Sequence, residues 1–325
     1  MVVEHPGGPD VLQPRELPRP ELQDGWTLVR VTAFGLNRSE LFTRRGLSPT
    51  VRFPRVLGIE CVGIVESSSD PRLPTGTTVA AAMGGMGRQF DGSYAQYVLL
   101  PTDHLMPVSS HLPWHVLAAV PESFLTAYGS LEALEIRPGH RLLIRAATSS
   151  VGMAALALAA GRGVEVAATT RDPGKAPKLL QYGADHVVVD EGGGLGKGVR
   201  AIWPDGVDRV LDLVGGATVL DSLSLLSSGG RVCNSGILSD SWIISEFEPL
   251  EDIPSGTTLT TFSSSSINSG DWARHALQEH LDEINKGGRQ VLIDRVFSLD
   301  EVAAAHHHME ANRAIGKVVA VVQHP

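Results

Sequence analysis

The segment RLLIRAATSSVGMAALALAA, residues 141–160, decides the fold. Its apolar start predicts a buried strand, the small residues at 146–149 predict a tight turn, and the run Ser150 to Ala160 predicts a helix. More strand patterns follow: VEVAATT at 164–170, HVVVD at 186–190, VDRVLDLV at 207–214, GRVCNSG at 230–236 and TTLTTF at 257–262. They alternate with helical patterns at 173–182, 218–226 and 271–286. About six such strands predict a doubly wound parallel sheet, and their consecutive apolar positions indicate helices on both faces.

Both ends of the chain have a different, β-rich pattern. Short strands are expected at WTLVRVTA 26–33, VGIVE 62–66, TTVAAA 77–82, YAQYVLL 94–100, VLIDRVF 291–297 and KVVAVV 317–322. Helical patterns occur here only around residues 39–45 and 299–312. We therefore expect two domains: a β-barrel made of residues 1–120 and 289–325, which would hold the substrate, and a dinucleotide-binding domain of residues 121–288.

The composition excludes several classes of protein. Of 325 residues, 42% are hydrophobic and 19% are charged, which is typical of an ordered globular chain. The net charge of −9 argues against nucleic acid or an anionic membrane as a partner. The longest apolar run, Val151–Ala160, is too short for a membrane span, which needs roughly 18 residues.

Cysteine usage and the N-terminal sequence suggest a cytoplasmic location. Cys61 and Cys233 are too few for a disulfide framework or a four-thiolate zinc site, and both are expected to pack in the core. The opening MVVEHP has neither a basic leader nor an apolar segment, so we expect no secretory signal and a mature protein that starts near residue 1.

The turn at residues 145–152 lies where a dinucleotide fold binds a pyrophosphate. Small residues there allow backbone N–H groups to approach phosphate oxygens. A strict G-x-G-x-x-G is absent, and only Gly152 remains of the usual glycines. The alternative is a small-residue turn without a phosphate.

The end of the next predicted strand bears on the choice of nicotinamide cofactor. No carboxylate stands at 166–171, where an NAD-binding chain places one on the ribose. Thr170, Arg171 and Lys175 offer hydroxyl and cationic donors that suit a 2′-phosphate, although Asp172 weakens the local field. This favours NADPH over NADH. The alternative is an ordinary solvated loop.

Taken together, the chain resembles the medium-chain dehydrogenase/reductase superfamily, specifically its zinc-free quinone oxidoreductase-like branch, over essentially its whole length. The motifs that carry the resemblance are GGPDVL 7–12, GLNRSELFTRRG 35–46, PRVLGIECVGIV 54–65, GSYAQYVLLP 92–101, LTAYGSL 125–131, RPGHRLLIRAATSSVG 137–152, YGADHVV 182–188, GVDRVLDLVGG 206–216 and GKVVAVV 316–322. The resemblance implies a chaperonin-10-like barrel built from both chain ends, a Rossmann domain, bound NADPH, and a homodimer formed through an edge strand at 257–262.

The zinc ligands of related alcohol dehydrogenases are replaced. Asn37 stands where those enzymes have a Cys, Ile59 stands where they have a His, and a four-cysteine lobe is missing between Ala80 and Tyr94. We therefore expect no metal, and with it no metal-held alkoxide. A zinc alcohol dehydrogenase with ligands at other positions is the least favoured alternative.

The resemblance also implies the site residues. The expected catalytic residues are Asn37, Glu40 and Thr126. The expected cofactor-binding residues are Thr126, Ser149, Ser150, Val151, Thr170, Arg171, Lys175, Ser235, Gly236, Ile237 and Lys317. Ser149 and Ser150 replace paired glycines of the family, so their backbone has to form the turn despite a Cβ. Glu40 stands where relatives commonly have Asp, and Leu47 where they commonly have Tyr, so the substrate preference can have moved.

These residues predict an NADPH-dependent, zinc-independent reductase. Hydride would go to a quinone or an α,β-unsaturated carbonyl, an apolar small molecule, while hydrogen-bond donors stabilise the charge that grows on its oxygen. The altered phosphate turn and the missing Tyr leave an alternative, a non-redox protein on the same scaffold that binds the cofactor or catalyses a rearrangement or cyclisation.

Three other features have a plain structural interpretation. His306, His307 and His308 would diverge around a helix, so they are expected on a solvated surface and not around one ion. The glycine-rich run 192–198 lacks the residues of a P-loop and is expected to be a flexible connection. The loop 83–92 either lines an apolar pocket or caps the barrel.

Overall fold

The computed structural model describes residues 1–190, 195–267 and 270–324. Contacts divide the chain into a first unit, Met1–Leu125 with Ser265–Pro325, and a second unit, Thr126–Ser264. The sequence pattern predicted borders after residues 120 and 288. Helix α9 (Asp271–Asn285) lies in the first unit, where the Gln278 amide exchanges two hydrogen bonds of 2.9 Å with the backbone of Ser109.

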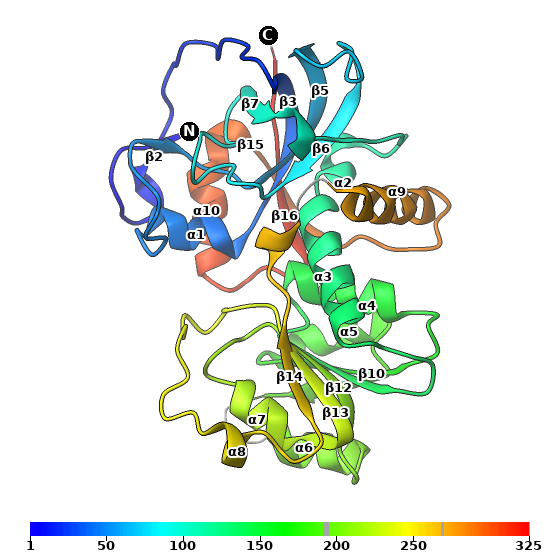
Figure 1. Ribbon diagram of the computed structural model, residues 1–325. Helices are drawn as coiled ribbons and strands as arrows, with labels where there is room; N and C mark the ends of the chain where they lie inside the picture. Colours follow the sequence, from blue (N-terminus) through cyan, green and yellow to red (C-terminus); the bar gives the residue numbers. More distant parts are fainter. Residues whose placement is uncertain (191–194, 268–269, 325) are drawn as a thin grey trace. The chain divides into compact units, whose positions relative to one another are not determined.

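The first unit is built around a seven-stranded sheet with the order β15-β16-β3-β5-β6-β8, in which β7 also pairs with β3. Its strands are β3 (Trp26–Leu36), β5 (Glu60–Ser68), β6 (Thr78–Ala82), β7 (Tyr97–Pro101), β8 (Met106–Pro107), β15 (Ile293–Ser298) and β16 (Lys317–Val321). Figure 1 shows β16, near the end of the chain, beside β3, and these two strands pair antiparallel. Strands from both β-rich ends of the sequence therefore share this sheet.

Smaller elements complete the first unit. They are a sheet of β1 (Val2–Val3), β2 (Leu12–Gln13) and β4 (Arg55–Val56), and the helices α1 (Arg38–Arg44), α2 (Trp114–Leu117) and α10 (Val302–Glu310), with the start of α3 (Pro121–Ala133). The core includes Phe34 and Tyr94, whose rings stack with centroids 4.8 Å apart. Packing of α1 and α10 near this core brings residues from both ends of the chain together.

The second unit contains a six-stranded parallel sheet with the order β11-β10-β9-β12-β13-β14. Its strands are β9 (Arg141–Arg145), β10 (Glu165–Thr170), β11 (His186–Val189), β12 (Val207–Asp212), β13 (Leu226–Asn234) and β14 (Thr258–Thr261). The helices are α4 (Ser150–Ala159), α5 (Ala176–Gln181), α6 (Leu195–Ile202), α7 (Val219–Ser224) and α8 (Pro249–Asp252) (Figure 1). Leu142, Leu143 and Ile144 are all buried, so β9 is covered on both faces. The predicted doubly wound α/β fold is confirmed.

Some local predictions were wrong. Leu195–Gly198 do not form a loop but begin α6, whose Leu195 and Val199 are buried, while residues 191–194 lie outside the described part of the chain. His306 is not solvated but fully buried, because that side of α10 packs against the rest of the first unit. The neighbouring His307 and His308 instead meet Asp10 and Asp294, so the three rings diverge as expected.

Candidate active site

A buried polar cluster lies in the first unit where β3 runs into α1. Asn37 is the N-cap residue of α1, and its backbone N–H donates to Glu40 Oε2 at 3.1 Å. Glu40 Oε1 also accepts the N–H of Ile59, at 3.3 Å. Glu40 is thus the N3 carboxyl that reaches back to the N-cap, an arrangement that fixes the first turn of a helix.

Lys317 enters this cluster from the first residue of β16. Its Nζ lies 2.6 Å from Glu60 Oε1, donates to Asn37 Oδ1 at 2.6 Å, and donates to Ser123 Oγ at 2.9 Å. The Asn37 amide Nδ2 in turn donates to Glu60 Oε1 at 2.9 Å. Lys317 and Glu60 are 2% and 0% exposed, so this ion pair is removed from water. One ammonium therefore joins β16 to β5, to α3 and to the start of α1.

Burial changes the protonation of Glu40. Desolvation by burial and then the nearby Glu60 carboxylate raise the pKa of Glu40, whereas the Lys317 ammonium and two backbone hydrogen bonds lower it, and the net result is a pKa of about 8. The Glu40 carboxyl therefore keeps its proton at neutral pH. Burial and the same two carboxyls also raise the pKa of Tyr94 well above its usual range. At neutral pH the cluster thus offers a protonated carboxyl beside an ion pair.

The far end of α1 is held by a second buried network. Arg44 donates through Nε to Gly7 O at 3.0 Å, contacts Glu310, and lies 3.0 Å from His306 Nδ1 through Nη1. Because a guanidinium only donates, His306 Nδ1 accepts and Nε2 carries the hydrogen, which is donated to Tyr94 Oη at 3.0 Å. Burial, and then the charge of Arg44, lower the pKa of His306 to about 3. His306 is therefore neutral and structural.

The turn between β9 and α4 in the second unit forms with both serines in place. Ser149 has φ −69° and ψ 164°, an extended conformation that needs no glycine, and Ser150 starts α4. Ser149 Oγ caps this helix by accepting the Gly152 N–H at 3.1 Å. A Cβ on Gly152 would lie 2.6 Å from Ala147 O, so the remaining glycine is required for the helix to approach the strand. Helix geometry leaves the N–H groups of Ser150 and Val151 without intrahelical acceptors.

The polar side chains at the end of β10 make hydrogen bonds to the backbone that follows the strand. Thr170 Oγ1 donates to Asp172 O and accepts the Asp172 N–H, both at 3.1 Å. Asp172 Oδ1 accepts the Gly174 N–H at 2.9 Å. Asp172 therefore caps the short helix Pro173–Lys175. Arg171 is exposed and Lys175 is half-buried. Two cationic side chains thus lie at the end of β10.

The remaining predicted residues lie elsewhere in the second unit. Thr126 is buried on α3, and its carbonyl lies 2.6 Å from Ser130 Oγ, which is 2.8 Å from Ser235 Oγ. A Cβ on Gly236 would fall onto the backbone of Leu213, so the segment 235–237 packs closely against the residue that follows β12. The predicted residues thus form separate groups: Asn37, Glu40 and Lys317 in the first unit, and the others in the second.

Sequence reasoning missed two members of the buried cluster, Glu60 and Ser123. Glu60 lies within the motif at 54–65, where it was not singled out. A signal was present, because one carboxylate stands inside the otherwise apolar run LGIECVGIV at 57–65, and a buried carboxylate needs a partner. Ser123 gives no comparable signal in the sequence.

The described residues give little support to other sites. Among residues 1–190, 195–267 and 270–324, no group of three or more His, Cys, Asp or Glu side chains is placed to hold a metal ion. No helix within those ranges is long and apolar enough to cross a bilayer. Cys61 and Cys233 are free and buried, and burial raises the pKa of Cys61 to about 12, as expected for a packing residue.

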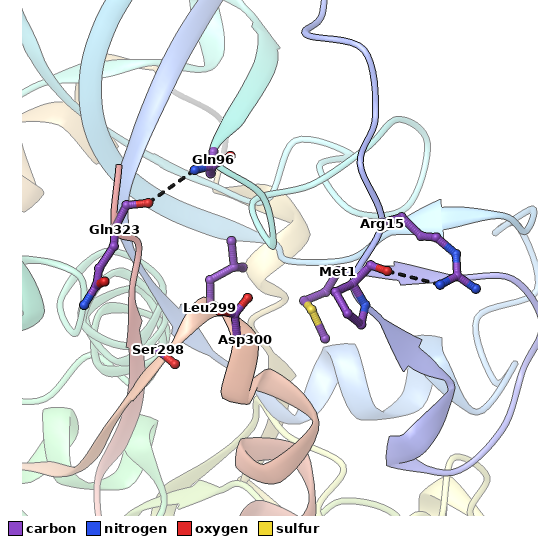
Figure 2. Close-up of a pocket in the computed structure, with 8 residues that line it drawn as sticks. Met1, Arg15, Gln96, Ser298, Leu299, Asp300 and Gln323 are labelled. Atoms are coloured by element: carbon purple, nitrogen blue, oxygen red, sulfur yellow. Dashed lines mark hydrogen bonds between the residues drawn. The ribbon is translucent and has the colours of Figure 1, made fainter. Parts of the chain in front are cut away.

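The loop 83–92 packs onto the first unit. Met86 is part of the core, and the Phe90 ring meets Trp26 edge to face at 5.3 Å. This packing favours the capping role over the pocket-lining role. A separate hollow of about 250 Å³ in the first unit contains none of the predicted site residues (Figure 2). It is lined by Met1, Pro14, Arg15, Gln96, Ser298, Leu299, Asp300 and Gln323.

Comparison with known families agrees with the fold of both units. Residues 23–110 match the model of the alcohol dehydrogenase GroES-like domain, and residues 182–320 match the model named zinc-binding dehydrogenase. The chain belongs to the medium-chain dehydrogenase/reductase superfamily, in its quinone oxidoreductase-like branch. The second model's name concerns zinc, but its match does not include the positions of Asn37 and Ile59.

Individual relatives are distant. The chain is 28% identical to the putative quinone oxidoreductase YhfP of Bacillus subtilis over 306 residues, which cover 91% of this chain and 90% of the relative. It is 27% identical over 329 residues to a phenolphthiocerol/phthiocerol polyketide synthase subunit of Mycobacterium tuberculosis, covering 99% of this chain but only 15% of that protein. The solved structure of mycobacterial Rv1454c complexed with NADPH is 26% identical, with a TM-score of 0.87 and 98% of each chain covered.

Proposed function

We propose that this protein is an NADPH-dependent, zinc-independent oxidoreductase that reduces a quinone or an α,β-unsaturated carbonyl. The observation that carries the proposal is the turn between β9 and α4. It forms with Ser149 and Ser150 in place and leaves helix N-terminal N–H groups available to an anion. Family membership and the mycobacterial relative complexed with NADPH support a nicotinamide cofactor.

The second unit would hold the cofactor. The N–H groups of Ser150 and Val151, with the two serine hydroxyls, would bind the pyrophosphate, and residues 235–237 and Thr126 would line the site further on. Arg171 and Lys175 would pair with the 2′-phosphate. NADPH is favoured over NADH because no carboxylate stands at 166–171 to accept a ribose hydroxyl, and Asp172 Oδ1 is used to cap the next helix. When bound, NADPH would supply the hydride.

The chain's own catalytic contribution would be hydrogen bonding to a developing oxyanion. Negative charge grows on the substrate oxygen as hydride reaches carbon, and preorganised donors stabilise it. Asn37, Glu40 and Thr126 would provide this environment. The protonated state of Glu40 supports this role, because a neutral carboxyl donates whereas a carboxylate would repel the charge. Solvent would supply the proton that completes the reduction.

Two further expectations belong to this proposal. β14 forms one edge of its sheet, which suits a homodimer formed through that strand, and light scattering would test the subunit number. A cytoplasmic location is expected from the two buried, free cysteines.

The direct test is oxidation of NADPH by purified protein with a panel of simple quinones and enones. Turnover with NADPH exceeding that with NADH supports the proposal, and no turnover across the panel contradicts it. The variant Lys175→Met should raise the dissociation constant for NADPH about tenfold, as expected for one lost charge-assisted contact. Lys178→Met, which removes the next lysine along and its contact with the Tyr182 ring, is the matched control.

A second candidate is a non-redox protein on the same scaffold. Ser149 Oγ already accepts the Gly152 N–H, which in a glycine turn would be free for phosphate, and this favours weaker cofactor binding. Fluorescence titration distinguishes the candidates: tight NADPH binding without oxidation indicates a binding module, and no binding indicates a role for the scaffold alone. A metal assay of active protein that detects stoichiometric zinc would contradict the zinc-independent mechanism.

A further inference from the structure

The buried cluster of Asn37, Glu40, Glu60, Ser123 and Lys317 assigns Lys317 a role other than the one its sequence suggests. Resemblance to the family places Lys317 among the cofactor-binding residues. An ammonium has three hydrogens to donate. The structure gives them three acceptors, Asn37 Oδ1, Glu60 Oε1 and Ser123 Oγ, at 2.6, 2.6 and 2.9 Å. In this arrangement no donor of Lys317 remains for a phosphate.

Lys317 determines how the Asn37 amide is oriented. Because an ammonium only donates, the amide atom that faces it has to be Oδ1, and Nδ2 has to face the other way. That places Nδ2 at 2.9 Å from Glu60 Oε1 and 3.5 Å from Glu40 Oε1. A neutral side chain at position 317 would remove this selection, and the amide could rotate.

The backbone of β3 leaves room for this ion pair. Gly35 lies opposite Val319 in the pairing of β3 with β16. A Cβ on Gly35 would fall well inside van der Waals contact of both Lys317 Cε and Glu60 Oε1. The φ angle of Gly35 is not in the left-handed region, so the glycine serves to provide space and not an unusual turn. This is independent evidence that the fold accommodates the pair at this point.

We propose that Lys317 is a positioning residue: its ammonium fixes the Asn37 amide and the Glu60 carboxylate beside Glu40, and it acts on the reaction through them without binding the cofactor. This inference rests on the proposed function, because it concerns the donors of the same site.

The charges around Glu40 make its ionisation depend on Lys317. Glu60 on β5 disfavours ionisation of Glu40, and Lys317 on β16 favours it. Glu122, whose Oε2 is 3.9 Å from Lys317 Nζ, adds a third carboxyl, and further titratable groups around the cluster include Cys61, Tyr94, Arg44 and His306. Removing Lys317 leaves the carboxyls without their ammonium and moves the titration of Glu40 to higher pH.

The test compares Lys317→Met and Lys317→Arg with the surface control Lys286→Met, which removes only an exposed pair with Glu283. We expect Lys317→Met to lower kcat at least tenfold, to leave the dissociation constant for NADPH within twofold, and to move the alkaline limb of the pH profile upward. Lys317→Arg, which keeps the charge, should restore part of the kcat. Lys286→Met should match the unaltered protein in all three.

Opposite results would overturn the inference. A tenfold rise in the dissociation constant for NADPH with unchanged kcat would make Lys317 a cofactor ligand, and no change in any readout would remove its role. If Lys317→Met does not fold, Lys317→Met with Glu60→Gln removes both charges together, and the same split between kcat and cofactor affinity is required of it.

The experiments distinguish a failure of the proposed function from a failure of this inference. If the unaltered protein oxidises no NADPH, the hydride-transfer proposal fails, whereas the pH dependence of unfolding still reports on the cluster. The midpoint of the Glu40 titration should then be higher in Lys317→Met than in the unaltered protein. An unchanged midpoint would overturn the electrostatic part of the inference.

Discussion

Replacing Glu40 by Gln tests the central electrostatic feature of the first unit. Glu40 is 1% exposed, and its pKa is raised from 4.5 to about 8, first by burial and then by Glu60. The unfolded chain loses this proton near pH 4.5, whereas the folded chain keeps it up to about pH 8. Stability is therefore expected to fall as the pH rises between these values and to level off above them.

The size of the effect follows from the two pKa values. Between pH 5 and 9 the free energy of unfolding of the unaltered protein should decrease by about 3 to 5 kcal/mol through Glu40 alone. Glu40→Gln has nearly the same shape, retains an oxygen for the Asn37 N–H, and does not titrate. The variant should therefore gain stability relative to the unaltered protein as the pH rises, by this same amount.

Urea unfolding at pH 5, 6, 7, 8 and 9 measures the effect. Glu283→Gln, which changes an exposed carboxyl in the same way, is the matched control and should follow the unaltered protein throughout. A difference between Glu40→Gln and the unaltered protein that stays constant from pH 5 to 9 would refute the reasoning, because Glu40 would then ionise alike in the folded and unfolded states.

Three further predictions concern other parts of the molecule. Gly35→Ala should lower the free energy of unfolding by about 1–3 kcal/mol because its Cβ would displace the buried ion pair; equal urea midpoints for variant and parent would contradict the close approach. His306 has a pKa of about 3, so stability should be lost as the pH falls from about 6.5 toward 3, since the unfolded chain binds a proton there and the folded chain does not. His306→Gln should weaken that acid dependence, and unchanged acid unfolding midpoints would count against it. Ser149→Ala should destabilise α4 by about 1 kcal/mol through loss of its cap, which thermal melting can measure against Ser239→Ala, a hydroxyl outside any helix.

Much of the fold could be predicted from the sequence because the patterns that specify strands and helices involve residues close together in the chain. Apolar strands alternating with helices between residues 141 and 261 specify the parallel sheet, and the six strands occur where the pattern places them. Element ends were less accurate: the pattern at 299–312 corresponds to a short 3-10 turn followed by α10, Val302–Glu310. The error at 195–198 has a similar origin, because glycines in a helix are tolerated when the apolar side of that helix is buried.

Only part of the candidate site could be predicted from the sequence. Asn37, Glu40 and Lys317 were singled out, yet their mutual contact joins residues 280 positions apart and was not predicted. Ser149 shows the converse case. The sequence raised a concern about a Cβ in the turn, and the backbone angles show that this position needs no glycine.

The sequence by itself determined the fold class, since hydrophobic periodicity and turn residues act over a few positions of the chain. Only the tertiary structure decided that Lys317, Glu60 and Asn37 form one buried cluster and that His306 is interior. Protonation and partners depend on burial and on charges that come from distant segments, and those distances exist only once β3, β5 and β16 have paired.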